Sequence, residues 1–131
     1  MKNKETVKNL RNFIKQILEI YRKKVKRLLR VVLPIVWMIL IFYGSSRQSV
    51  KVVDKFWLNF FFFKTLHFCE YAVLFFLNAG FLKNKKTALI FTLLYAAFDE
   101  IHQLFVPTRQ GALRDFFIDT LGAGSVWFLT K

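Results

Sequence analysis

The chain has 131 residues, of which 55% are hydrophobic and 18% aromatic, including 17 Phe, and its formal net charge is +13. A soluble domain of this size rarely combines so much phenylalanine with so few acids, so the composition argues against an ordinary soluble protein. The basic residues are segregated from the apolar ones, which favours a membrane protein oriented by its charges over a nucleic-acid-binding protein. The single cysteine, Cys69, excludes an intrachain disulfide, and its apolar neighbours predict a buried thiol.

Residues 1–30 form the first predicted element, a basic amphipathic helix. They hold 11 Lys and Arg against two Glu, and their apolar residues recur mostly at steps of three and four. A basic amphipathic helix next to a membrane segment is expected to lie on the cytoplasmic interface, where it binds anionic lipid. The alternative, that these charges serve only to orient the chain in the membrane, stays open.

Four apolar segments follow, and each is predicted to be a transmembrane helix: residues 28–43, 65–82, 87–106 and 112–130. Pro34 falls in the first turns of the first segment, where a missing N–H matters least. The Phe-rich residues 56–63 are too few to span, so they are expected to form a short interfacial helix. Gly122 and Gly124 in the last segment are expected to let helices approach closely.

The predicted fold is therefore an all-α membrane protein. It consists of the basic amphipathic helix, residues 1–30, and a domain of four transmembrane helices, residues 31–131. Of the 21 Lys and Arg, 15 lie in the N-terminal region, the turn at 83–86 and the last residue, and 6 lie in the other connections. The positive-inside rule then predicts a multi-pass cell-membrane protein with both termini in the cytoplasm.

Polar residues inside these segments are the candidate functional site. An ionisable group at membrane depth is costly unless it faces protein or water, so it is a functional candidate by default. At 1.5 Å per residue, Glu70, Asp99 and Asp119 lie at similar depths, about 8–10 Å from the outer ends of their segments. The predicted cluster comprises His67, Glu70, Tyr71, Asp99, Glu100, His102, Gln103, Arg109, Asp115 and Asp119. We expect Arg109 to pair with Glu100, Asp115 or Asp119, in a layer that opens outward.

Several of these residues stand in patterns that resemble the VanZ-like membrane proteins, a family named for a teicoplanin-resistance protein. The patterns are Ser45-Ser46 after the first segment, Lys64-x-x-His67-Phe68-x-x-Tyr71, Glu100-x-x-Gln103-x-Phe105-x-Pro107-x-Arg109, and Asp115-x-x-x-Asp119-x-x-Gly122. The chain departs from the family pattern at Thr108, Asp119 and Ser125, where Gly, Asn and Gly are common. The resemblance covers residues 35–130, leaves out the basic helix, and implies a small bacterial integral membrane protein of the cell envelope, sometimes linked to glycopeptide resistance.

Three functions remain open at this stage. The first is binding of a membrane lipid or cell-wall precursor headgroup, with arginine contacting phosphate. The second is a membrane-embedded enzyme acting on a lipid-linked substrate, in which histidines and carboxylates transfer protons. The third is a small transporter or proton relay, which would call for a homo-oligomer. Because no known metal-ligand spacing and no evident nucleophile is present, we expect binding rather than catalysis, no metal and no cofactor. The remaining alternative is a purely structural one, in which the polar residues only hold the helices together.

Overall fold

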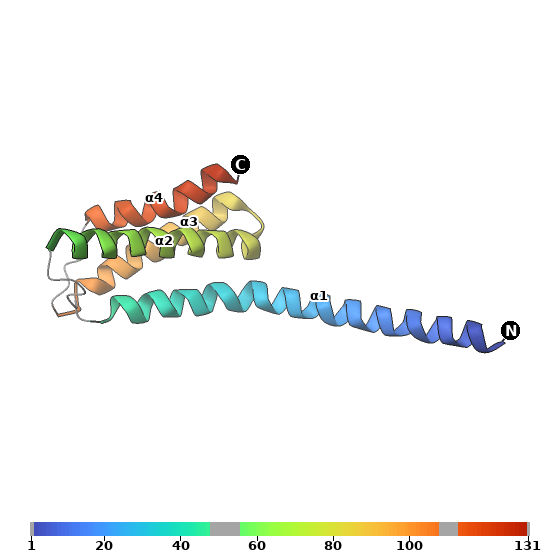
Figure 1. Cartoon of the computed structure of the whole chain (residues 1–131). Helices are drawn as coiled ribbons and strands as arrows, with labels where there is room; N and C mark the ends of the chain where they lie inside the picture. Colours follow the sequence, from blue (N-terminus) through green and yellow to red (C-terminus); the bar gives the residue numbers. More distant parts are fainter. Residues whose placement is uncertain (1, 48–55, 108–112, 131) are drawn as a thin grey trace. The chain divides into compact units, whose positions relative to one another are not determined.

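The computed structural model describes residues 2–47, 56–107 and 113–130, and every regular element in these ranges is an α-helix (Figure 1). The helices are α1, Lys2–Ser45; α2, Phe56–Leu82; α3, Lys85–Gln103; and α4, Leu113–Leu129. The prediction of an all-α protein is confirmed. The chain divides into two compact units, Met1–Val32 and Leu33–Lys131, so that the first unit is the N-terminal part of α1.

Two helices are longer than the sequence predicted. The amphipathic region and the first apolar segment form one uninterrupted helix, α1, and Pro34 lies inside it rather than in a first turn. The Phe-rich stretch that begins at Phe56 is not a separate interfacial helix, because it continues without a break into α2. Neither junction contains a glycine. Hydropathy marks where a helix meets lipid, and it does not mark where the helix ends.

Among the described residues, two helices are long and apolar enough to cross a membrane. They lie within Thr6–Ser45 and Phe60–Leu82. Helix α4 has 17 residues, which rise about 26 Å. That is slightly less than the hydrocarbon thickness of a typical bilayer, about 30 Å. The structure thus supports membrane spans for two of the four predicted segments by length and composition, and the spans at α3 and α4 stay predictions.

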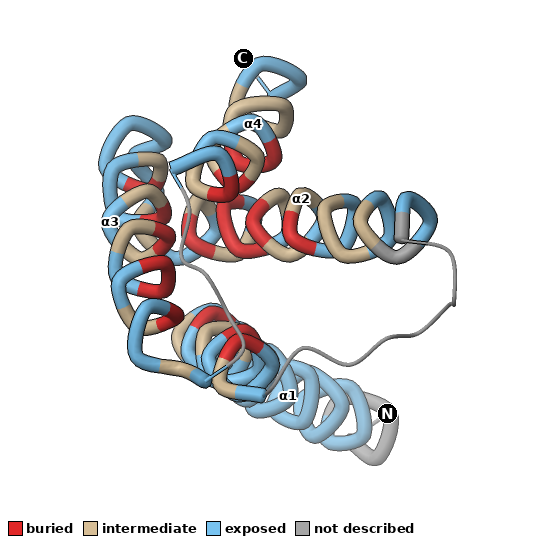
Figure 2. The backbone as a smooth tube through the Cα atoms, turned by 90° about the vertical axis from the view of Figure 1, so that its left-hand side faces the viewer, coloured by how far each residue is buried: buried red, intermediate tan, exposed pale blue. Residues whose placement is uncertain are grey.

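The second unit is held together by a core between α2, α3, α4 and the end of α1. Buried positions of α2, α3 and α4 face one another (Figure 2). One apolar cluster consists of Ile41, Tyr71, Leu74 and Ala96, and another of Phe75, Ala88 and Ala123. The indole of Trp37 donates a hydrogen bond to the carbonyl of Glu70 (2.9 Å), and the hydroxyl of Tyr95 donates one to the carbonyl of Met38 (2.6 Å). These bonds tie α1 to both α2 and α3.

The turn between α2 and α3 is tight because each of its residues has a distinct backbone role. Lys83 adopts a positive φ of 59°, which ends α2. Asn84 caps α3, and its side-chain oxygen accepts hydrogen bonds from the backbone N–H groups of Lys86 (3.0 Å) and Thr87 (3.3 Å). The turn therefore carries positive charge and also has a defined backbone conformation, set by Lys83 and Asn84.

Helices α2 and α4 approach each other closely at Gly122. A Cβ added there would lie 2.2 Å from the carbonyl oxygen of Phe68, a distance that real Cβ atoms do not reach. The expectation that a glycine permits close approach is confirmed at this position. It is wrong for Gly124, where an added Cβ would meet no atom within 4 Å.

Candidate functional site

Polar side chains gather where α2 and α4 run side by side. His67 Nδ1 lies 3.5 Å from Asp119 Oδ1 and 4.0 Å from Glu70 Oε2. Lys64 forms an ion pair with Asp115. The helical repeat explains the grouping, since Lys64, His67 and Glu70 are spaced by three residues and Asp115 and Asp119 by four, so that each set shares one face of its helix.

A second set of polar contacts joins the end of α1 to the end of α3. The Ser45 hydroxyl donates a hydrogen bond to Asp99 Oδ1 (2.5 Å), and the Gln103 amide donates one to Asp99 Oδ2 (3.0 Å). Asp99 is fully buried, and both of its oxygens are thus satisfied. Ser46 Oγ lies 3.0 Å from His102 Nε2, and the Phe42 ring stacks on the His102 ring with centroids 4.3 Å apart.

The two sets belong to one layer, which we call the polar layer. Tyr71, one helical turn after His67, and Ala96, one turn before Asp99, belong to the same buried cluster, which brings the two sets together. The described members are Ser45, Ser46, Lys64, His67, Glu70, Tyr71, Asp99, Glu100, His102, Gln103, Arg114, Asp115 and Asp119. All four helices contribute to it, because the C-terminal ends of α1 and α3 and the N-terminal halves of α2 and α4 lie at the same end of the unit.

Several buried side-chain atoms of the polar layer make no hydrogen bond to a described residue, and the Tyr71 hydroxyl and Asp119 Oδ2 are two of them. The Tyr71 hydroxyl is fully buried and makes no hydrogen bond there. Asp119 is also fully buried, and its Oδ2 accepts no hydrogen bond from a described residue. Leaving a buried polar atom unsatisfied costs about 1–3 kcal/mol. The layer therefore holds one donor and one acceptor that a small polar group would satisfy.

Two cations border the layer, and they share a single carboxylate. Arg114 Nε lies 3.5 Å from Asp115 Oδ1, and Asp115 also pairs with Lys64. The ring of Phe60 lies against both, 4.8 Å from the Arg114 guanidinium carbon and 5.5 Å from Lys64 Nζ. Arg114 is 64% exposed, so its charge is accessible at the edge of the layer.

Nine of the ten predicted site residues lie in the described part of the chain. Seven of them are buried: His67, Tyr71, Asp99, Glu100, Gln103, Asp115 and Asp119. Glu70 and His102 are half-buried. Arg109 lies outside the described residues, so its pairing stays a prediction. Within the described ranges, no group of three or more His, Cys, Asp or Glu side chains could hold a metal ion.

Sequence reasoning missed three participants and misplaced one. Ser45 and Ser46 stand in the family pattern but not in the predicted cluster. A pair of hydroxyl groups at the end of a helix can nevertheless contact polar groups of a neighbouring helix. Lys64 stands one helical turn before His67, which was a usable signal that it shares that face. Cys69 was expected to be buried, but its side chain is exposed on the surface of α2.

The family follows from a comparison of the whole chain with protein-family models. The model described as VanZ/LLP1 matches residues 30–131, more than three quarters of the sequence. The chain belongs to the VanZ/LLP1 family. No curated protein and no solved structure matches it. The VanZ-like resemblance of the residue patterns is thereby confirmed.

The VanZ/LLP1 match contains the whole polar layer. It begins at residue 30 and so includes the part of α1 that carries Ser45 and Ser46, together with α2, α3 and α4. Residues before 30 lie outside it. Family membership and the two apolar helices together identify a membrane protein.

Proposed function

We propose that this VanZ/LLP1 family member is a multi-pass membrane protein whose polar layer binds an anionic headgroup, that of a membrane lipid or of a lipid-linked cell-envelope precursor. In this proposal α3 and α4 also cross the membrane, both termini lie in the cytoplasm, and the layer faces outward. The observation that carries the proposal is the pair of unsatisfied buried groups, Tyr71 Oη and Asp119 Oδ2, beneath a cationic border.

The border has the chemistry that a phosphate group requires. Lys64 and Arg114 both contact the single carboxylate of Asp115, so positive charge is in excess at this edge, whereas the layer as a whole also contains the carboxylates of Glu70, Asp99, Glu100 and Asp119. An arginine can also donate two parallel hydrogen bonds to phosphate oxygens. The flexible stems of both side chains let them shift from Asp115 to a bound anion.

The interior of the layer suits the remainder of a headgroup. Asp119 Oδ2 can accept a hydrogen bond from a hydroxyl, amide or amine, and the Tyr71 hydroxyl can donate one. A purely structural layer would be expected to satisfy these groups internally, as it does for Asp99. The resemblance to a teicoplanin-resistance protein adds the proposal that binding at this layer changes sensitivity to that glycopeptide.

Native mass spectrometry of the detergent-purified protein tests the proposal. Phosphatidylglycerol and a polyprenyl phosphate serve as anionic probes in separate titrations, and phosphatidylcholine serves as the zwitterionic reference. We expect tighter binding of an anionic probe, and the probe that binds more tightly distinguishes a bulk lipid from an envelope precursor. Substituting both Lys64→Gln and Arg114→Gln should weaken that binding about tenfold, which corresponds to about 1.4 kcal/mol.

The control removes the same charge from the turn between α2 and α3, with Lys83→Gln and Lys86→Gln. These side chains are exposed at the other end of the unit. Equal affinity for anionic and zwitterionic lipid would refute the proposal. So would an equal loss of binding in the control, because the effect would then be one of net charge alone.

One contact supports a second candidate, a membrane-embedded acyl-transfer enzyme. Ser46 Oγ lies 3.0 Å from His102 Nε2, as a nucleophile and its general base would, although its hydroxyl donates to the carbonyl of Phe42 (2.6 Å) and would have to turn from that carbonyl to donate to His102. Labelling by a serine-reactive fluorophosphonate that is lost in Ser46→Ala and His102→Gln but retained in Ser45→Ala would favour the enzyme. Absence of labelling in the unsubstituted protein would remove this candidate.

A further inference from the structure

The N-terminal unit carries a surface that the proposed headgroup site does not use. Residues 6–30 are helical, and nearly all of their side chains are exposed, including Leu18 (60%), Tyr21 (67%) and Leu28 (62%). Of these residues, only residue 30 lies within the family match, which begins there. A large exposed apolar surface on a highly charged helix requires an explanation of its own.

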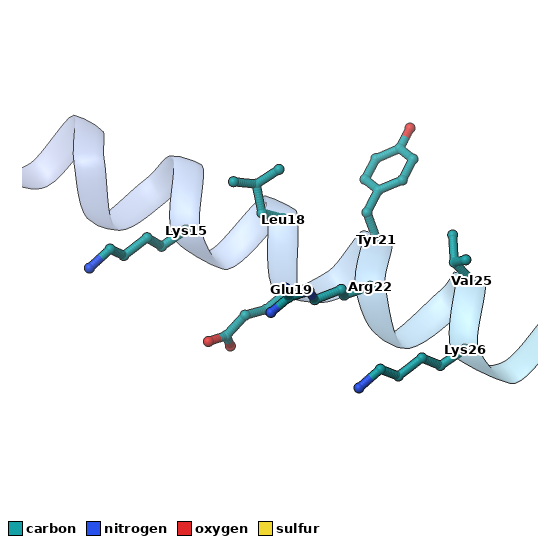
Figure 3. A pocket seen from close by; sticks show the side chains of 7 residues that line it. All are labelled: Lys15, Leu18, Glu19, Tyr21, Arg22, Val25 and Lys26. Carbon is teal, nitrogen blue, oxygen red and sulfur yellow. The ribbon is translucent and has the colours of Figure 1, made fainter.

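The apolar and basic side chains occupy opposite faces of this helix. At 100° per residue, ten of the eleven large apolar side chains at positions 6–30 fall within one arc of about 160°, and Leu29 lies outside it. We call these ten the apolar stripe: Val7, Leu10, Phe13, Ile14, Ile17, Leu18, Ile20, Tyr21, Val25 and Leu28. Eight of the nine Lys and Arg at positions 6–30 lie in the complementary arc. Figure 3 shows this division, with Leu18, Tyr21 and Val25 on one side and Lys15, Glu19 and Lys26 on the other.

We propose that residues 6–30 bind the surface of an anionic lipid bilayer, with the apolar stripe in the acyl region and the basic arc against the headgroups. The charge of residues 6–30 favours an anionic bilayer over a second copy of the chain as the partner. Positions 6–30 carry nine Lys and Arg against the single acid Glu19, which favours contact with negative lipid and opposes side-by-side packing of two copies. A helix of this kind lies in the interfacial plane.

Two further observations support a bilayer as the partner. Helix α1 continues directly into the apolar residues of a candidate membrane span, so the segment stays within reach of the membrane surface. Pro34 has no N–H to donate to the carbonyl of Arg30, which gives α1 a weak point beyond the last basic residue, where a bend costs least. A segment that only oriented the chain by charge would need no apolar stripe.

The test uses the full-length protein in nanodiscs, with Cys69→Ser as background because Cys69 is exposed. An environment-sensitive NBD fluorophore is attached at Ile17→Cys, in the apolar stripe, or at Lys26→Cys, on the opposite, basic face of the helix. The nanodiscs contain either phosphatidylcholine alone or an equal mixture with phosphatidylglycerol. In the mixture, the label at position 17 should shift to the blue and brighten several-fold, while the label at position 26 should keep a water-like spectrum.

The dependence of the fluorescence shift on charge distinguishes an anionic bilayer from a second copy of the chain as the partner of the apolar stripe. The shift at position 17 should diminish in concentrated NaCl and in a variant combining Lys15→Gln, Arg22→Gln and Lys23→Gln, because screening or removal of the charges weakens attraction to the lipid. A water-like spectrum at position 17 in both nanodiscs contradicts the proposal. An equal blue shift at position 17 in both kinds of nanodisc, together with disulfide cross-linking of two chains through Cys at that position, would show that a second copy covers the apolar stripe. The outcome does not depend on whether the polar layer binds a headgroup.

Discussion

At the scale of single residues, the surroundings of a side chain decide its role more than its chemical type does. Asp99 and Asp119 are both fully buried aspartates, yet Asp99 receives hydrogen bonds from Ser45 and Gln103, whereas Asp119 Oδ2 receives none from a described residue. Asp99 therefore holds α1 to α3, whereas Asp119 Oδ2 can still accept a hydrogen bond from the proposed headgroup. The sequence placed both in one cluster but could not distinguish them.

Gly122 and Gly124 allow a sharp prediction at this scale. Gly122→Ala should destabilise the protein by about 1–3 kcal/mol, because the new methyl group would overlap the Phe68 carbonyl and force α2 and α4 apart. Thermal unfolding of detergent-purified protein, followed by circular dichroism, measures the effect as a lower midpoint. Gly124→Ala is the matched control and should not lower the midpoint. Equal midpoints for both variants would mean that the close approach at Gly122 does not matter for stability.

At the scale of elements, polar contacts set how the helices pair in the interior of the unit. Asn78 on α2 donates a hydrogen bond to Thr92 Oγ1 on α3 (3.0 Å), and Thr92 in turn donates to the carbonyl of Ala88 (2.8 Å). Both side chains are fully buried. Such contacts fix the register of one helix against another, which apolar packing alone leaves less defined.

A double-mutant cycle on Asn78 and Thr92 measures this contact. Asn78→Leu and Thr92→Val should each lower the stability, and their coupling energy should be about 0.6–2 kcal/mol, the range found for hydrogen bonds between membrane helices. Unfolding in sodium dodecyl sulfate gives the free energies of the four proteins. Additive effects of the two substitutions would show that the hydrogen bond does not contribute to the pairing of α2 with α3.

At the scale of the whole molecule, the distribution of charge predicts how the chain crosses the membrane. The turn at 83–86 carries three lysines and is tied to the other end of the chain by a hydrogen bond from Lys85 to the carbonyl of Thr130. The connection between α3 and α4 carries Arg109. With both termini in the cytoplasm, the lysine turn faces the cytoplasm and position 109 faces outward.

Cysteine accessibility in intact cells tests this orientation. In the Cys69→Ser background, Arg109→Cys should react with a membrane-impermeant maleimide added from outside, and Lys85→Cys should react only after the membrane is permeabilised. The opposite pattern would place the polar layer at the cytoplasmic side and exclude a headgroup of the outer leaflet as its ligand. Equal protection of both positions would show that the connection at 109 does not reach the outer surface.

The sequence by itself determined the all-α class and the family of the protein, and it nominated the residues of the candidate site. Helical periodicity, segregated charge and long apolar runs predicted an all-α membrane protein, because these properties depend on local spacing and on transfer of side chains from water. Helical spacing also placed His67 with Glu70, and Asp115 with Asp119, on shared helix faces, while Lys64 entered only through the family pattern Lys64-x-x-His67.

Only the tertiary structure decided which polar groups meet. The contacts of Ser45 with Asp99, of Ser46 with His102, and of His67 with Asp119 join residues more than 50 positions apart along the chain. The same applies to Gly122, whose importance comes from a backbone carbonyl on another helix. Contacts of this kind depend on the rotation and depth of each helix in the bundle, and a helical pattern read along one segment does not contain that information.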